Sequence, residues 1–97
     1  MFLGTSRYVL KITGESMIGK GIMPGDYVVV ETARAAKDGD IVVALVDNNE
    51  ATLKTLLIND DETLTLMPAN ESYDPITLSA RRLDIQGVIV GQLRTYP

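Results

Sequence analysis

Apolar and polar residues alternate along much of this chain with a period of two, which is typical of β-strands that bury one face. In the segment 7–12, the side chains of Tyr8, Leu10 and Ile12 fall on one face. The segment 63–67 alternates threonine with leucine in the same way. No apolar run approaches the roughly 20 residues that a membrane span needs. The pattern therefore predicts a chain of short strands with little helix.

Turn-forming residues separate these strands. Proline, glycine, asparagine and aspartate cluster between the apolar runs, and they favour the backbone conformations that tight turns require. The cluster at 47–50 predicts a hairpin between 41–46 and 51–58. We expect about seven strands in an all-β domain of curved antiparallel sheets. The clearest of these strands are 7–12, 27–30, 41–46, 51–58, 63–67 and 85–93.

Three irregular features are also expected. Ser16 precedes a short glycine-rich segment and is predicted to start a single helical turn. The segment 68–75 is predicted to be an irregular loop. Gly87 and Gly91 interrupt the last strand, where they indicate bulges or close approaches of neighbouring backbones.

Length and composition limit the functions that are open to the chain. Its 97 residues suit one domain. With 13 acidic and 9 basic residues the net charge is −4, which argues against direct binding of nucleic acid. The chain has no cysteine, which fits a reducing compartment, and we expect a cytoplasmic protein without membrane contact. The acidic turns lack the spacing of a calcium loop, so no metal or other cofactor is expected.

Ser16 is the candidate nucleophile, and Lys54 is the candidate base because the chain contains no histidine. Lysine accepts a proton only when neutral, and with a pKa of about 10.4 about one lysine in two thousand is neutral at pH 7. Burial among apolar groups lowers that pKa. In an extended strand Lys54 shares a face with Leu56 and with Thr52, whose hydroxyl is placed to orient the lysine nitrogen. The alternative is structural: a turn serine and an exposed strand lysine.

Six short motifs give the chain a resemblance to a known family. In order and spacing they resemble the C-terminal domain of LexA repressors, and they are similar to the mutagenesis protein UmuD and to the cleavage domains of phage repressors. These proteins are autopeptidases that use a serine and a lysine. The motifs are GESM at 14–17, GIMPGD at 21–26, DGDIV at 38–42, ATLK at 51–54, LMPAN at 66–70 and IQGVIVG at 85–91.

The resemblance implies that Ser16 attacks a scissile carbonyl and that neutral Lys54 accepts its proton. It also implies that Glu15, Met17 and Thr52 surround the oxyanion and the substrate. The usual family substrate is an Ala-Gly bond in the protein's own chain, and no Ala-Gly pair occurs here. We therefore expect residues 1–97 to be a peptidase and dimerisation domain without the cleavage segment or the DNA-binding domain, and to act on a peptide supplied in trans.

The same resemblance implies partners. A homodimer is expected through the extended segment 92–96, and the relatives imply activation by a RecA filament. Two alternatives stay open: a UmuD-like subunit that binds a translesion polymerase, and a dimerisation module without catalysis. A lipoyl-type carrier fits less well, because Lys54 lies within a strand and not at a hairpin tip.

Overall fold

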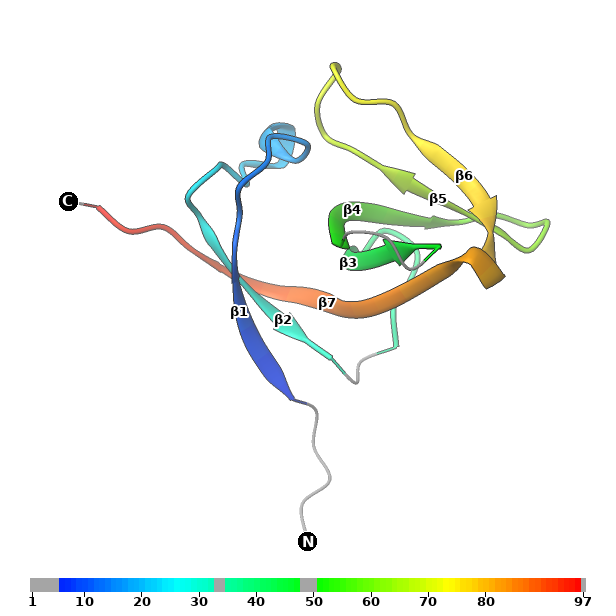
Figure 1. Cartoon of the computed structure of the whole chain (residues 1–97), viewed down its shortest axis with the longest axis horizontal. Coiled ribbons are helices and arrows are strands. Elements are labelled where there is room, and N and C mark those ends of the chain that lie inside the picture. Colours follow the sequence, from blue (N-terminus) through cyan, green and yellow to red (C-terminus); the bar gives the residue numbers. More distant parts are fainter. Residues whose placement is uncertain (1–5, 33–34, 48–50, 97) are drawn as a thin grey trace, which may run out of the picture.

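The computed structural model describes residues 6–32, 35–47 and 51–96, and in this part of the chain it is mainly β. The strands form one antiparallel sheet in the order β1-β2-β7-β3-β4-β5-β6 (Figure 1). Two short 3-10 helices accompany the sheet. The elements are β1 (Arg7–Lys11), η1 (Ile18–Lys20), β2 (Tyr27–Glu31), β3 (Ile41–Val46), β4 (Ala51–Ile58), β5 (Thr63–Met67), β6 (Ile76–Ser79), η2 (Ala80–Arg82) and β7 (Leu83–Leu93).

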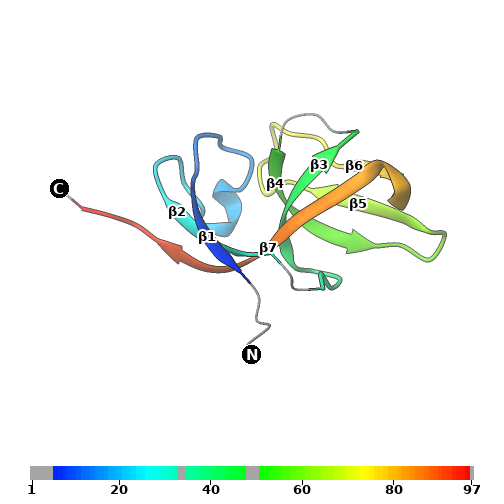
Figure 2. The same ribbon diagram turned by 60° about the horizontal axis from the view of Figure 1, so that its bottom comes forward.

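The predicted all-β class and the main strands are confirmed. β3 to β6 follow one another as a meander, whereas β7 returns to lie between β2 and β3. β7 is the longest strand, and its two halves have different partners: Leu83 to Val88 pair with β3, and Val88 to Leu93 pair with β2. Figures 1 and 2 show β7 crossing the molecule and joining the two parts of the curved sheet.

Bulges in β7 accompany this change of partner. The β2–β7 register shifts between Val29 and Val30, and the β3–β7 register shifts between Val43 and Ala44. At Gly87 an added Cβ would lie 2.5 Å from Cγ1 of Val30. The predicted irregularities of the last strand are therefore confirmed, and Gly87 marks a close approach to β2.

Two hydrophobic clusters cover opposite faces of β3. Val43 belongs to the first cluster, while its neighbours Val42 and Ala44 belong to the second. All three side chains are buried, as expected for a strand that is apolar on both faces. The first cluster also contains Ile12, Met17, Ile22, Val28 and Val30, and the second also contains Leu56, Leu66 and Val88.

The turn residues before β3 have structural partners. Asp40 Oδ2 accepts a hydrogen bond from the N–H of Lys37 at 2.8 Å, and Asp38 Oδ1 accepts one from the N–H of Ile58 at 2.7 Å. Both carboxylates therefore bond to backbone donors of the turn and of β4. Of the predicted hairpin turn at 47–50, residues 48–50 lie outside the described residues, but the pairing of β3 with β4 is as predicted.

β6 and η2 are additions to the predicted set of elements. Arg81 and Arg82 lie in η2. Arg82 Nε donates to Asp47 Oδ1 at 3.0 Å, which links η2 to the end of β3. This ion pair is exposed, so its contribution to stability is small.

Candidate active site

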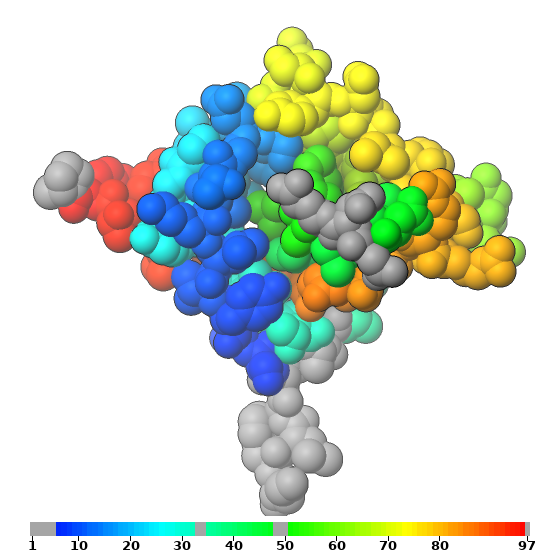
Figure 3. Space-filling model, viewed as in Figure 1, coloured from blue at the N-terminus to red at the C-terminus, as the bar shows by residue number. Residues whose placement is uncertain are grey.

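A groove of about 330 Å³ lies between the segment that follows β1 and the first half of β4. Residues 10–17 form one wall, and residues 51–54 form the other. Val43 and Tyr73 complete the lining. In Figure 3 the surface between the blue N-terminal segment and the green β3–β4 region is hollowed.

The groove exists because two strand edges face it without a strand partner. β4 pairs with β5 only from Thr55 to Ile58, so on that side residues 51–54 have no strand neighbour among the described residues. β1 is an edge strand of the sheet and pairs only with β2. Unpaired strand edges offer N–H and C=O groups to an extended peptide.

Ser16 lies in the turn between β1 and η1, the short helix expected here, but the N-cap of η1 is Met17 and not Ser16. Its carbonyl accepts a hydrogen bond from the N–H of Ala69 at 2.6 Å. The N–H of Gly19 donates in turn to the carbonyl of Ala69, also at 2.6 Å. The Met17 side chain, 2% exposed, anchors the turn in the first hydrophobic cluster. These contacts fix the backbone that carries the hydroxyl.

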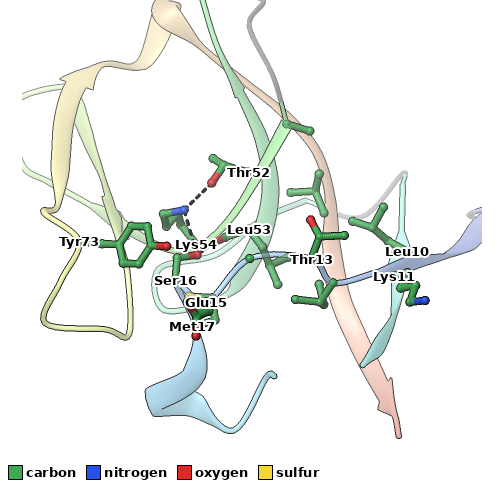
Figure 4. A pocket seen from close by; sticks show the side chains of 14 residues that line it. Leu10, Lys11, Thr13, Glu15, Ser16, Met17, Thr52, Leu53, Lys54 and Tyr73 are labelled. Carbon is green, nitrogen blue, oxygen red and sulfur yellow. Dashed lines mark hydrogen bonds between the residues drawn. The ribbon is translucent and has the colours of Figure 1, made fainter. Parts of the chain in front are cut away.

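Lys54 brings its amino group to this hydroxyl from β4. Lys54 Nζ lies 3.2 Å from Ser16 Oγ, and it also donates a hydrogen bond to the Thr52 hydroxyl (Figure 4). Ser16 Oγ lies 3.4 Å from the carbonyl oxygen of Leu53. The structure thus brings together three of the residues that the sequence singles out: Ser16, Lys54 and Thr52.

The surroundings of Lys54 favour its neutral form. The residue is half-buried, and its neighbour across the strand pair is the fully buried Val42. Burial lowers the pKa of Lys54 because a charged ammonium loses hydration. Within the described residues Lys54 forms no ion pair that would oppose this effect. A neutral Nζ carries a lone pair, and Ser16 Oγ lies within hydrogen-bond distance of it.

The backbone at Ser16 has free donors among the described residues. Among the described residues, no hydrogen bond is formed by the N–H of Ser16 or by the N–H of Met17. Since the Met17 side chain is buried, only its backbone is available to a substrate. Glu15 is exposed, and its carbonyl accepts a hydrogen bond from Asn70 Nδ2 at 2.8 Å.

The loop 68–75 contributes residues that sequence reasoning did not assign to the site. Ala69 and Asn70 hold the Ser16 turn through the hydrogen bonds given above. Tyr73 lines the groove, and Figure 4 shows its ring beside Ser16 and Lys54. The available signal was an aromatic residue in an otherwise polar loop, which is too common to identify a site by itself.

Other kinds of site find little support in the described part of the chain. No cluster of three or more acidic, histidine or cysteine side chains is placed to bind a metal ion there. Among the same residues, no helix is long and apolar enough to cross a membrane.

The chain is similar to a family of peptidases and to repressor proteins. The model of a family described as Peptidase S24-like matches residues 2–90. The LexA repressor of Zymomonas mobilis is 44% identical over 96 residues, which are 98% of this chain and 44% of that protein. The LexA repressor of Koribacter versatilis is 45% identical over 89 residues, 92% of this chain and 42% of that repressor. The chain thus spans less than half the length of these curated relatives.

Proposed function

Because this chain belongs to the S24-like peptidase family, we propose that it is the serine peptidase domain of a LexA-like repressor. In this proposal Ser16 is the nucleophile and neutral Lys54 is the general base. The observation that carries the proposal is the distance of 3.2 Å between Lys54 Nζ and Ser16 Oγ, inside a groove lined by residues 10–17 and 51–54. A base must lie within this range of the proton that it removes.

The reaction follows from these positions. Lys54 Nζ takes the hydroxyl proton as Ser16 Oγ forms a bond to the carbonyl carbon of the scissile peptide. The resulting ammonium then gives its proton to the leaving nitrogen, the C–N bond breaks, and an acyl-enzyme remains. Lys54, neutral again, takes a proton from the water that attacks the ester. When the ester breaks, Ser16 recovers its proton from the Lys54 ammonium, and the carboxyl product leaves.

Backbone groups beside the nucleophile would stabilise the oxyanion. The N–H groups of Ser16 and Met17 form no hydrogen bond within the described residues, so they are free to donate to the developing charge. Thr52 holds Lys54 in place and so acts through the base. Glu15 lies next to the nucleophile and lines the groove, where its exposed side chain would contact substrate.

The groove favours an extended peptide as substrate. Its two walls are the β1 side and residues 51–54, and a peptide between them would pair with the unpaired strand edges. The 97 residues contain no Ala-Gly pair, the bond expected from the resemblance. We therefore assign to this chain the cleavage of a peptide supplied in trans, with no cofactor.

Cleavage in trans tests the proposal. A peptide with one central Ala-Gly bond is incubated with the parent chain, with Ser16→Ala and with Lys54→Ala, and the products are followed by mass spectrometry. Lys20→Ala is the matched control, because Lys20 is exposed and lies outside the groove. Cleavage by the parent and the control alone is expected. Equal cleavage by all four proteins would contradict the proposal.

A dimer is a second function that a specific observation favours. Residues 89–93 of β7 pair with β2 but not with β3, so their other edge has no strand partner among the described residues. Leu93, at the end of this edge, is 55% exposed. A second copy of the chain would cover this edge across a two-fold axis.

Sedimentation of the parent and of Leu93→Asp tests the dimer contact. Only the parent should dimerise, and a parent that stays monomeric at high concentration would exclude the contact.

The repressor assignment extends to the longer protein. The relatives are named as repressors, and a cytoplasmic repressor cleaved when it meets a RecA filament is the corresponding proposal. A UmuD-like subunit that binds a polymerase is the alternative. The reading frame around this chain distinguishes them, since a repressor requires a DNA-binding domain.

A further inference from the structure

Tyr73 lines the groove but is not part of the hydrophobic core. Its side chain belongs to neither hydrophobic cluster and is 43% exposed. Its hydroxyl forms no hydrogen bond with another described residue. Nevertheless Figure 4 shows the ring pointing into the groove, with the hydroxyl directed toward Ser16 and Lys54. An aromatic residue exposed in this way at a groove offers an apolar ring face and a polar tip to a ligand.

The position of Tyr73 is fixed relative to the nucleophile. Ala69 forms two backbone hydrogen bonds of 2.6 Å with the turn that carries Ser16, and Asn70 Nδ2 donates to the carbonyl of Glu15 at 2.8 Å. The N–H of Tyr73 donates to the carbonyl of Asn70 at 3.1 Å, which closes a tight turn between them. These hydrogen bonds join the loop to the Ser16 turn, and the ring of Tyr73 lies beside Ser16 and Lys54.

The groove extends unequally on the two sides of Ser16. In Figure 4 Leu10 and Lys11 lie at one end, Ser16 and Lys54 lie further along, and Tyr73 lies beyond them. The longer side runs from Ser16 to Leu10 and Lys11. Because Lys54 must give its proton to the leaving nitrogen, the leaving residue begins beside Lys54. A peptide that continued past this point, away from Leu10, would reach the ring of Tyr73.

We propose that Tyr73 forms the subsite for the residues that follow the scissile bond, so that the preferred substrate is a peptide that continues on that side. This inference rests on the proposed peptidase function and adds a binding residue to it. The ring packs against the backbone and aliphatic atoms of the leaving segment, and the hydroxyl hydrogen-bonds to its backbone. Tyr73 thereby helps to place the scissile carbonyl at Ser16.

Two substrates separate this role from a structural one. The first is a peptide with four residues after the scissile bond, and the second is a peptide ester that ends at the scissile carbonyl and a small alcohol. In Tyr73→Ala we expect KM for the long peptide to rise about tenfold, while hydrolysis of the ester stays within about twofold. Tyr73→Phe keeps the ring and is expected to retain most of the binding. Ile76→Ala, whose side chain is 47% exposed and outside the groove, is the control.

The possible results distinguish the two proposals. Equal losses on both substrates in Tyr73→Ala would show that the residue acts through the fold and would overturn the inference. Ser16-dependent cleavage of the long peptide that is unchanged in Tyr73→Ala would overturn it as well, while leaving the peptidase proposal intact. Cleavage that survives Ser16→Ala would instead overturn the peptidase proposal and, with it, this inference.

Discussion

Lys54 Nζ lies 3.2 Å from Ser16 Oγ, although 38 positions separate the two residues in the chain. The contact joins a turn after an edge strand to the part of β4 that β5 leaves uncovered. Burial lowers the pKa of Lys54 at this place, and the Thr52 hydroxyl accepts a hydrogen bond from the same nitrogen. The pair thus combines short distance, orientation and reduced hydration, which a lysine needs to act as a base.

Thr52 is predicted to position this base. In Thr52→Val the side chain keeps its shape but loses the hydroxyl that holds Lys54 Nζ. The loss of one hydrogen bond of about 1 kcal/mol should lower kcat about fivefold in the trans-cleavage assay. Thr52→Ser restores the hydroxyl and should restore most of the rate. A Thr52→Val protein as active as the parent would show that Lys54 is oriented by other contacts.

Gly19 is predicted to be required for the contact between the Ser16 turn and the loop 68–75. An added Cβ would lie 2.6 Å from the carbonyl oxygen of Ala69, which belongs to the backbone and has little freedom to move. Gly19→Ala should therefore lower the free energy of unfolding by about 1–3 kcal/mol, measured by urea titration. Gly14→Ala is the control, since nothing lies within 4 Å of a Cβ there. Similar losses in both variants would contradict the clash.

Arg94 is predicted to control stability in acid through Asp26. Arg94 Nε donates to Asp26 Oδ1 at 2.8 Å, and the Asp26 side chain is only 3% exposed. Hydrogen bonds from Arg94, and then from the N–H of Met23, hold the pKa of Asp26 well below its usual range. The stability that this provides is present above the unfolded pKa of about 3.9 and is lost as the pH falls below it.

Urea titrations at pH 7 and pH 3 test this linkage. Arg94→Gln should be less stable than the parent at pH 7 and should lose less further stability between pH 7 and pH 3, because the pKa of Asp26 moves back toward its ordinary value. Arg81→Gln, which removes an exposed arginine at the other end of the sheet, should behave as the parent does. An acid loss in Arg94→Gln as large as that of the parent would refute the assignment.

The strands were accessible from the sequence because their signals are local, whereas the pair of Ser16 and Lys54 was singled out chiefly by the resemblance to a known family. Alternation and turn residues define the strands, and the absence of histidine indicates only that any base for Ser16 must be unusual. The insertion of β7 between β2 and β3 was not accessible, because alternation does not identify a strand's neighbours. Backbone hydrogen bonds attach Ala69 to the Ser16 turn, and these leave no side-chain pattern. The sequence also does not show that Tyr73 lies beside Ser16, because only the folded chain brings the two residues together.

The pH dependence of acylation tests the central claim most directly, namely that neutral Lys54 is the base for Ser16. In single turnovers with saturating peptide, the rate should rise tenfold per pH unit and then level off at an apparent pKa below the ordinary value for lysine, because burial lowers the pKa of Lys54. The residual rate of Lys54→Ala should lack this rise. A parent rate that is independent of pH while chemistry is rate-limiting, or the same rise in Lys54→Ala, would contradict the claim.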